Sequence, residues 1–191
     1  MNLELIIKTP AVSAYYDRAN DWLYLDWSGV LSLHDVQNGC LAVAKCFLER
    51  SYTRILNDNS NVTHVAPDVA NWLATAYLPH MTLAGIQHIA WVYAPDLDAQ
   101  CYVEIALYTH AMPVVALFND VASACTWLAQ AHLICAVPSA VAPRSAAENQ
   151  TELRARLAQV DNPMRPAAGI HAEPEAEHVL VPELVGAVAA R

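Results

Sequence analysis

The chain has 191 residues, of which 55% are apolar and 15% charged, and this composition excludes a wholly disordered protein. Since a domain usually holds about 100–150 residues, we expect one domain with an appendage. Ten Lys and Arg against nineteen Asp and Glu give a net charge of -9, which repels phosphate groups. Nucleic acids and membrane surfaces are therefore not expected as partners.

The first elements in chain order are strands. Residues Trp22–Trp27 place apolar side chains on one face at a period of two, and Ala11–Asp17 has the same character. Turn residues at Arg18–Asp21 join the two runs, which predicts an antiparallel hairpin. Residues 1–10 form an N-terminal extension in which Leu3–Ile7 can add a further edge segment.

A helix is predicted to begin at Ser32 and to end near Arg50. Ser32 and Asp35 have the spacing of a capping box, and apolar residues follow at intervals of three and four. Gly39 inside this helix lowers its propensity, and its simplest explanation is close packing against a neighbour. A short strand, Thr53–Asn57, comes next.

The rest of the domain alternates between helices and buried strands. The expected elements are a helix that opens at Pro67–Asp68 and ends before Pro79, a strand Ile86–Tyr93, a helix Pro95–Tyr108, a strand Val114–Phe118, and a helix from Val121 to about Leu128 capped by Asn119 or Asp120. This order predicts an α/β fold with a mixed, mostly parallel sheet, an antiparallel N-terminal hairpin, and helices packed on the sheet.

The domain is expected to span residues 11–137, and residues 138–191 form a tail rich in Ala and Pro. Six of the eleven prolines lie in these last 54 residues. Thr151–Val160 has the pattern of one short exposed helix, which is marginal in water when isolated. We therefore expect a largely disordered tail.

The cysteines and the hydropathy of the chain indicate a cytoplasmic protein. No apolar run approaches the length of about 18–20 residues that crosses a bilayer, and the N-terminus lacks the pattern of a secretory signal. The cysteines are odd in number, widely spaced and never in a C-x-x-C pair: Cys40, Cys46, Cys101, Cys125 and Cys135. This usage fits a reducing compartment and neither a disulfide framework nor a zinc ribbon.

Motifs for catalysis are absent from the sequence. It contains no H-E-x-x-H, no paired cysteines, no G-x-S-x-G and no glycine-rich loop, so we expect no metal and no cofactor. Because catalytic triads are defined by geometry, an enzyme is not excluded on this ground. Its candidate residues are His64, Asp58 and His88.

A polar cluster, Leu56–His64, follows the buried strand and is the most unusual segment of the chain. Loops at the carboxyl ends of strands bind ligands and partners in open α/β sheets, which favours a recognition or modification loop. The alternative is an Asn/Asp turn whose side chains bond their own backbone. Trp22 and Trp72 have two interpretations as well, an interface anchor or core packing.

Several segments resemble a known family. They are Asp17, Asn20–Tyr24, Asp26–Gly29, Leu56–Asn59 and Ala90–Tyr93. Together with the element order they resemble uncharacterised bacterial proteins with the SpoIIAA-like, or STAS, fold. The resemblance implies a module that binds a protein kinase partner and is phosphorylated on Ser or Thr. Asp68 occupies the aligned acceptor position here, so that position lacks the hydroxyl that Ser or Thr phosphorylation requires.

Three functions follow from these observations. The first is a non-enzymatic protein-interaction or regulatory module that acts through Asp58, Asn59, Ser60, Asn61, Asp68 and Trp72. The second, implied by a resemblance to CRAL-TRIO lipid carriers, is a carrier of a small apolar ligand or lipid in a pocket between helices and sheet, which requires about 300 Å³. The third is a small hydrolase-type enzyme. A homodimer is also expected if the aromatic hairpin lies at the sheet edge.

Overall fold

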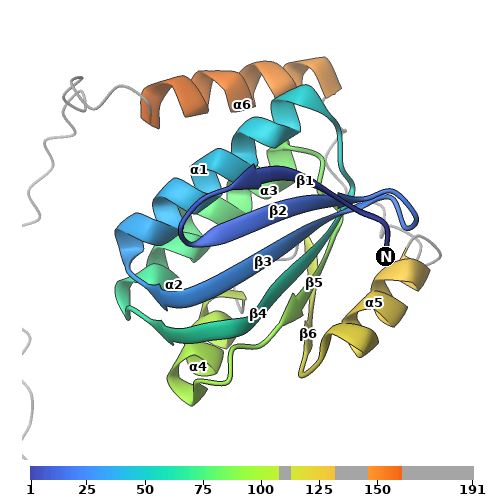
Figure 1. The fold of residues 1–191 in the computed structure, drawn as a ribbon. Helices are drawn as coiled ribbons and strands as arrows, with labels where there is room; N and C mark the ends of the chain where they lie inside the picture. The colour runs from blue at the N-terminus through green and yellow to red at the C-terminus, as the bar shows by residue number, and fades with distance from the viewer. Residues whose placement is uncertain (108–112, 132–145, 161–191) are drawn as a thin grey trace, which may run out of the picture.

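The computed structural model describes residues 1–107, 113–131 and 146–160, which form six strands and the helices around them (Figure 1). The strands are β1 (Leu3–Lys8), β2 (Val12–Asp17), β3 (Trp22–Leu31), β4 (Arg54–Val65), β5 (His88–Val92) and β6 (Val114–Phe118). They form one sheet in the order β1-β2-β3-β4-β5-β6, so every strand pairs with its neighbour along the chain. The first three strands are antiparallel and β3 to β6 are parallel, which confirms the expected mixed α/β sheet.

The N-terminal residues differ from the expected extension. Leu3–Lys8 pairs with β2 and forms one edge of the sheet, as the apolar pattern of this segment allowed. The aromatic hairpin of β2 and β3 therefore lies inside the sheet and not at its edge. The edge pairing that favoured a homodimer is unavailable to this hairpin, because β1 already occupies it.

Helices cover the two sides of the sheet unequally. They are α1 (Leu33–Glu49), α2 (Asp68–Trp72), the π-helix η1 (Leu73–Tyr77), α3 (Leu78–Leu83), α4 (Leu97–Leu107), α5 (Val121–Gln130) and α6 (Ala146–Val160). The larger buried cluster joins α1, α2, η1 and α3 to one side of the sheet. On the other side α5 packs against β4, β5 and β6 over a smaller cluster. Within the described ranges no helix has the length and apolarity needed to span a membrane.

Local signals placed two helix starts correctly. Ser32 and Asp35 form the predicted capping box of α1, and the Asp120 side chain accepts a hydrogen bond from the backbone N–H of Ser123 at the start of α5. The close packing expected at Gly39 is also present. A Cβ added there would lie 2.7 Å from Cη2 of Trp27, so only glycine lets this indole approach the helix.

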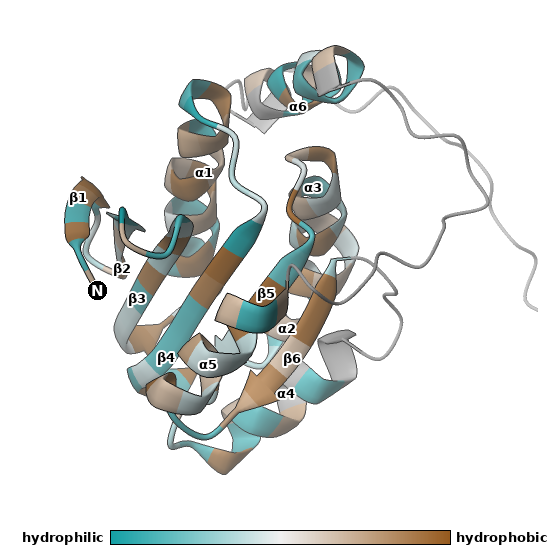
Figure 2. Cartoon of the chain, turned by 90° about the vertical axis from the view of Figure 1, so that its right-hand side faces the viewer, coloured by the Kyte–Doolittle hydropathy of each residue, from teal (hydrophilic) through white to brown (hydrophobic). Residues whose placement is uncertain are grey.

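The polar cluster Leu56–His64 lies within β4. This corrects two expectations, a short strand Thr53–Asn57 and a polar loop after it. β4 runs to Val65, pairing with β5 from Arg54 to Asp58 and with β3 from Ile55 to Val65, with two register shifts along the way. Figure 2 shows that a hydrophobic band near the start of β4 is followed by a hydrophilic stretch. Sequence patterns missed this extension because the partner of its polar half is β3, whose pairing is not local.

The helix expected to end before Pro79 instead continues to Leu83. It passes from α2 through the π-helical turn η1 into α3, where Pro79 lies in the first turn. Proline is tolerated in the first turn of α3 because the hydrogen-bond register changes there, so the helix does not need an N–H group from this residue. The prediction placed the break where the register change occurs.

Part of the tail that was expected to be largely disordered forms a helix in the structure. Residues Ala146–Val160 form α6, which packs against α1 and α3, and Leu153 is fully buried in the larger cluster. This packing supplies the burial that an isolated helix lacks. The remaining tail, 138–145 and 161–191, lies outside the described residues, as do residues 132–137 of the expected domain.

Candidate functional site

The polar half of β4 sends its side chains to both sides of the sheet. Asn57 and Asn59 face the side of the sheet that α1, α2, η1 and α3 cover, which we call the helical side. Asp58 between them faces the opposite side, because successive strand residues alternate. All three are buried, with exposed fractions of 5%, 9% and 3% in the order Asn57, Asn59, Asp58. One strand thus contributes to two chemically different sites.

On the helical side lies a partly enclosed cavity of about 50 Å³. It sits between the carboxyl halves of β3, β4 and β5 and the helices α1, α2, η1 and α4. Its lining includes Trp27, Cys40, Asn57, Asn59, Tyr77 and Trp91. Apart from Tyr93, its remaining walls are aliphatic. The cavity is far smaller than the space of about 300 Å³ expected of a lipid carrier.

A buried hydrogen bond fixes the orientation of the Asn57 amide. Trp27 Nε1 donates to Asn57 Oδ1 at 3.0 Å. Since an indole N–H is a donor only, the Asn57 oxygen must face Trp27 and its Nδ2 must face elsewhere. That Nδ2 has no hydrogen-bond partner among the described residues. Asn59 differs, because its Nδ2 donates to the carbonyl of Val92 at 2.9 Å.

Cys40 and Tyr77 form the opposite wall, where burial favours their protonated forms. Burial raises the pKa of the Cys40 thiol far above its ordinary value, and a hydrogen bond with Tyr77 opposes this rise only in part. Burial also raises the pKa of Tyr77, and the neighbouring Cys40 adds to the effect. A thiol that stays protonated is a poor nucleophile, so this cavity has no activated cysteine. The π-helical turn that carries Tyr77 also places Leu73 against the cavity.

The opposite side of β4 carries a pair of carboxylates. Asp26 and Asp58 are register partners on β3 and β4. Tyr24 donates to Asp58 Oδ2 at 3.0 Å, and Asn61 Nδ2 donates to Asp26 Oδ1 at 3.2 Å. Neither carboxylate forms an ion pair with Lys, Arg or His in the described part of the chain. Burial raises the pKa of Tyr24, and the negative charge of Asp58 raises it further.

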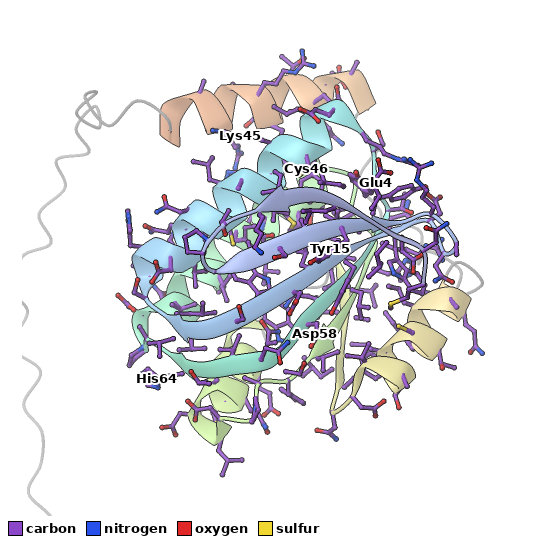
Figure 3. All side chains as sticks on the ribbon, viewed as in Figure 1. Glu4, Tyr15, Lys45, Cys46, Asp58 and His64 are labelled. Carbon is purple, nitrogen blue, oxygen red and sulfur yellow. The ribbon has the colours of Figure 1, made fainter. Side chains whose placement is uncertain are left out.

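Aromatic and aliphatic side chains continue this side toward the sheet edge. The rings of Tyr15 and Tyr24 stack with centroids 5.8 Å apart, and Leu5 is the next residue in the same cross-strand row. Leu5 is 52% exposed, and both tyrosines are half-buried. On this side α5 packs mainly against β4 to β6 and covers Trp22 at the start of β3, so β1, β2 and the rest of β3 are more open among the described residues (Figure 3). We call Leu5, Tyr15, Tyr24 and Asp26 the tyrosine face.

The structure divides the predicted partner-binding residues. Ser60 and Asn61 are exposed beside the tyrosine face, but Asp58 and Asn59 are buried. Asp68 and Trp72 lie on the helical side. The six residues therefore do not form one surface, because strand alternation separates neighbours in sequence.

Asp68 and the two tryptophans have clear positions. Asp68 is exposed in the first turn of α2, where a carboxylate is favourable, and Pro67 before it supplies no side-chain cap. Trp72 is half-buried and stacks on Tyr77 with ring centroids 5.9 Å apart. Trp22 is 1% exposed and belongs to the core beneath α5, so the core interpretation holds for it.

The candidate enzyme residues do not converge. His88 begins β5 and pairs with Arg54, whereas Asp58 pairs with Val92 at the other end of that strand, four residues or about 13 Å away. His64 lies near the end of β4 and its Nδ1 is 3.4 Å from Asp96. Burial lowers the pKa of His88, and the charge of Arg54 lowers it further. Among the described residues no cluster of His, Cys, Asp or Glu has the arrangement of a metal site.

Several residues of both sites were not singled out from the sequence. Trp27 was read only as one of the strand's apolar residues, although Gly39 signalled a bulky neighbour. Tyr15, Tyr24 and Asp26 were detectable, because a period of two in a strand puts Tyr24 and Asp26 on the same face. The free donor of Asn57 had no sequence signal, since it depends on the position of Trp27.

A comparison with solved structures finds a similar protein. Its crystal structure is that of an uncharacterised protein of the DUF3478 family with a SpoIIAA-like fold from Shewanella loihica PV-4. The sequences are 15% identical, the match covers 65% of this chain and 99% of that chain, and the TM-score is 0.46. No family model and no curated protein match this chain.

Proposed function

We propose that the protein is a non-enzymatic interaction module whose tyrosine face binds a protein partner that presents basic side chains between apolar ones. The observation that carries this proposal is the stacked pair Tyr15 and Tyr24 beside two carboxylates that have no cationic partner. Aromatic rings that are half-exposed on a rigid sheet supply contact area at low entropic cost. A regulatory role in the cytoplasm fits such a module.

The chemistry of the face favours a basic partner. Asp26 is half-buried, so its charge is only partly solvated and an incoming Arg or Lys gains a stronger interaction than at an open surface. The net charge of -9 adds long-range attraction for such a partner. Leu5 and the tyrosine rings supply the apolar contact around this charge.

Asp68 has no part in this binding. Its carboxylate stands where the resemblance expects a phosphorylated hydroxyl, and it lies on the helical side of the sheet. The proposed module is thus not switched by phosphorylation at Asp68.

The test is affinity capture followed by measurement with the purified partner. The full chain is immobilised, and proteins retained from a lysate of the source organism are compared between the unaltered chain, Tyr15→Ala and Asp26→Asn. Asp68→Asn and Leu97→Ala are matched controls, because these residues are exposed elsewhere. We expect each tyrosine-face variant to bind the purified partner about tenfold more weakly and the controls to bind normally.

Salt dependence separates a basic partner from a merely apolar one. Affinity for the unaltered chain falls as ionic strength rises, and Asp26→Asn reduces this dependence. Weakening by Asp68→Asn with unchanged binding by Tyr15→Ala would place the partner on the helical side and refute the proposal. Native mass spectrometry identifies the case in which the partner is a second copy of this chain.

A further inference from the structure

We propose that the tyrosine face selects arginine over lysine in its partner, with the plane of the guanidinium on the Tyr15 ring and its N–H edge against Asp26. This selection rests on the interaction proposed above, because arginine is one of the basic side chains that the face would bind. It narrows the partner to a segment in which an arginine stands between apolar residues.

Asp26 has a free and accessible carboxylate oxygen. Its Oδ1 accepts a hydrogen bond from Asn61 Nδ2, and its Oδ2 has no partner among the described residues. In that part of the chain the buried side-chain atoms without a partner are Trp22 Nε1 and Asn57 Nδ2, so Asp26 Oδ2 is accessible to solvent. A donor of the partner can therefore bond this oxygen without any movement of the sheet.

A buried negative charge lies next to this oxygen. Asp58 is the register partner of Asp26 and is 3% exposed. Its Oδ2 accepts from the Tyr24 hydroxyl and its Oδ1 from the backbone N–H of Ser60, and both donors are neutral. Burial raises the pKa of Tyr24, and the charges of Asp58 and Asp26 raise it further, so both charges reach this ring. A cation at Asp26 is thus attracted by two carboxylates.

Lys8 leaves these two charges unpaired. It is the register partner of Ser13 on β2, and Ser13 is the register partner of Asp26 on β3. Strands are about 4.8 Å apart, so the backbones of Lys8 and Asp26 are separated by about 10 Å. Among the described residues Lys8 forms no ion pair with Asp26 or Asp58. The space above Asp26 is therefore open to a cation from the partner.

The protein already holds one arginine in a similar arrangement. Tyr16 follows Tyr15 and points to the opposite side of the sheet, where Arg50 Cζ lies 3.7 Å from the centroid of its ring. The Tyr16 hydroxyl donates to Asp21 Oδ1 at 2.8 Å, and Arg50 Nη2 is 3.5 Å from the same oxygen. A second ring, that of Tyr52, is 5.8 Å from Arg50. The tyrosine face repeats this combination of two tyrosines and a tyrosine-bonded carboxylate, but without the cation.

The shape and hydration of the two cations favour arginine. A guanidinium is planar and weakly hydrated, so it can lie flat on a half-buried tyrosine ring while the N–H groups at its edge bond a carboxylate. The ammonium of lysine is a compact, strongly hydrated charge and loses more hydration on such a surface. Leu3 and Leu5 of β1 are exposed on the same side of the sheet and supply contacts for the apolar neighbours of the arginine.

The experiment compares two peptides on the full-length protein by NMR. Acetyl-Leu-Arg-Leu-Arg-Leu-amide and acetyl-Leu-Lys-Leu-Lys-Leu-amide have the same length, charge and apolar content, and they differ only in the cation. Carbon-13-labelled tyrosine rings, assigned with Tyr15→Phe and Tyr24→Phe, report binding at the face. We expect the arginine peptide to shift both rings in a saturable manner and to bind about fivefold more tightly than the lysine peptide.

Substitution of Tyr15 tests the stacking. Tyr15→Leu keeps an apolar side chain but removes the ring, so the two peptides should then bind equally, whereas Tyr15→Phe should keep the preference. The matched control is Tyr93→Leu, because Tyr93 is a half-buried tyrosine that donates to a carboxylate, that of Glu104, away from the tyrosine face. Asp26→Asn should weaken binding of the arginine peptide about tenfold, and it serves if Tyr15→Leu fails to fold.

Three results would overturn the inference. The first is equal affinity of both peptides for the unaltered protein; if Asp26→Asn then weakens both, the face binds basic side chains in general and the interaction proposed above stands. The second is the absence of any shift of Tyr15 and Tyr24 with either peptide, after which the capture experiment decides separately whether the face binds a protein.

The third is a preference for arginine that Tyr15→Leu leaves unchanged, which would place the peptide elsewhere on the protein. A preference that is lost in Tyr15→Leu and kept in Tyr15→Phe and Tyr93→Leu would support the selection of arginine by the tyrosine face.

Discussion

The two sides of β4 show how one strand can serve two different environments. Toward the helices, Asn57 lies in a packed wall with Trp27 and is shut off from solvent. Toward the other side, Asp58 borders an open sheet surface with Tyr24 and Asp26. The residues are adjacent in the chain, so the difference arises only from the side to which each points and from which helices cover that side. Packing should therefore dominate substitutions on one side, and polar interactions those on the other.

The largest expected effect is that of Trp27→Ala. Loss of a 5% exposed indole leaves a cavity and also removes the hydrogen bond to Asn57, so we expect a loss of about 3–5 kcal/mol in the free energy of unfolding. Urea unfolding measures it. Tyr15→Ala, on the open side, is the matched aromatic control and should cost less than half as much. Equal losses would mean that the two sides are packed alike.

Leu153→Ala tests whether α6 belongs to the domain. Leu153 is fully buried in the cluster with α1 and α3, so its truncation should lower the free energy of unfolding by about 2–5 kcal/mol. Leu97→Ala is the control, because Leu97 is 73% exposed on α4, and it should change stability by less than about 0.5 kcal/mol. A loss for Leu153→Ala as small as that of the control would show that α6 is not docked in solution.

Gly39→Ala tests the close approach of Trp27 to α1. The new Cβ would lie 2.7 Å from the indole, and such overpacking costs about 1–3 kcal/mol, against about 1 kcal/mol that alanine contributes to helix propensity. We expect a net loss in urea unfolding. In a Trp27→Leu background the same change should become stabilising, because the obstructing ring is gone. The same loss in both backgrounds would contradict the contact.

The smallest effect is expected for Tyr24→Phe on the open side. It removes one hydrogen bond to Asp58 next to solvent, which costs about 0.5–1.5 kcal/mol in the free energy of unfolding. Ultraviolet titration gives a second measurement. Since burial and Asp58 raise the pKa of Tyr24, its hydroxyl should ionise above the ordinary value of 10.0, and Asp58→Asn should bring the transition closer to that value. An unchanged titration in Asp58→Asn would show that the two groups do not interact.

Local patterns were enough to predict much of the architecture. The period of two in Trp22–Trp27, the capping box of Ser32 and Asp35, and the alternation of strands with helices depend on neighbours within a few residues, and all are present. Polar composition alone misled the prediction at Leu56–His64. Polar residues in a strand need a partner strand, and β3 lies more than 30 residues earlier in the chain.

The sequence by itself determined the fold class and the starts of α1 and α5, because each depends on local backbone preferences and on the spacing of nearby residues. Tertiary structure decided which polar groups became buried and which were left open. Asn57 has an unused donor only because Trp27 occupies its oxygen, and Tyr24 is half-exposed because it lies at the margin of the cluster that α5 covers. Both properties arise from contacts between residues that are distant in sequence, which is why they emerge only when the chain is folded.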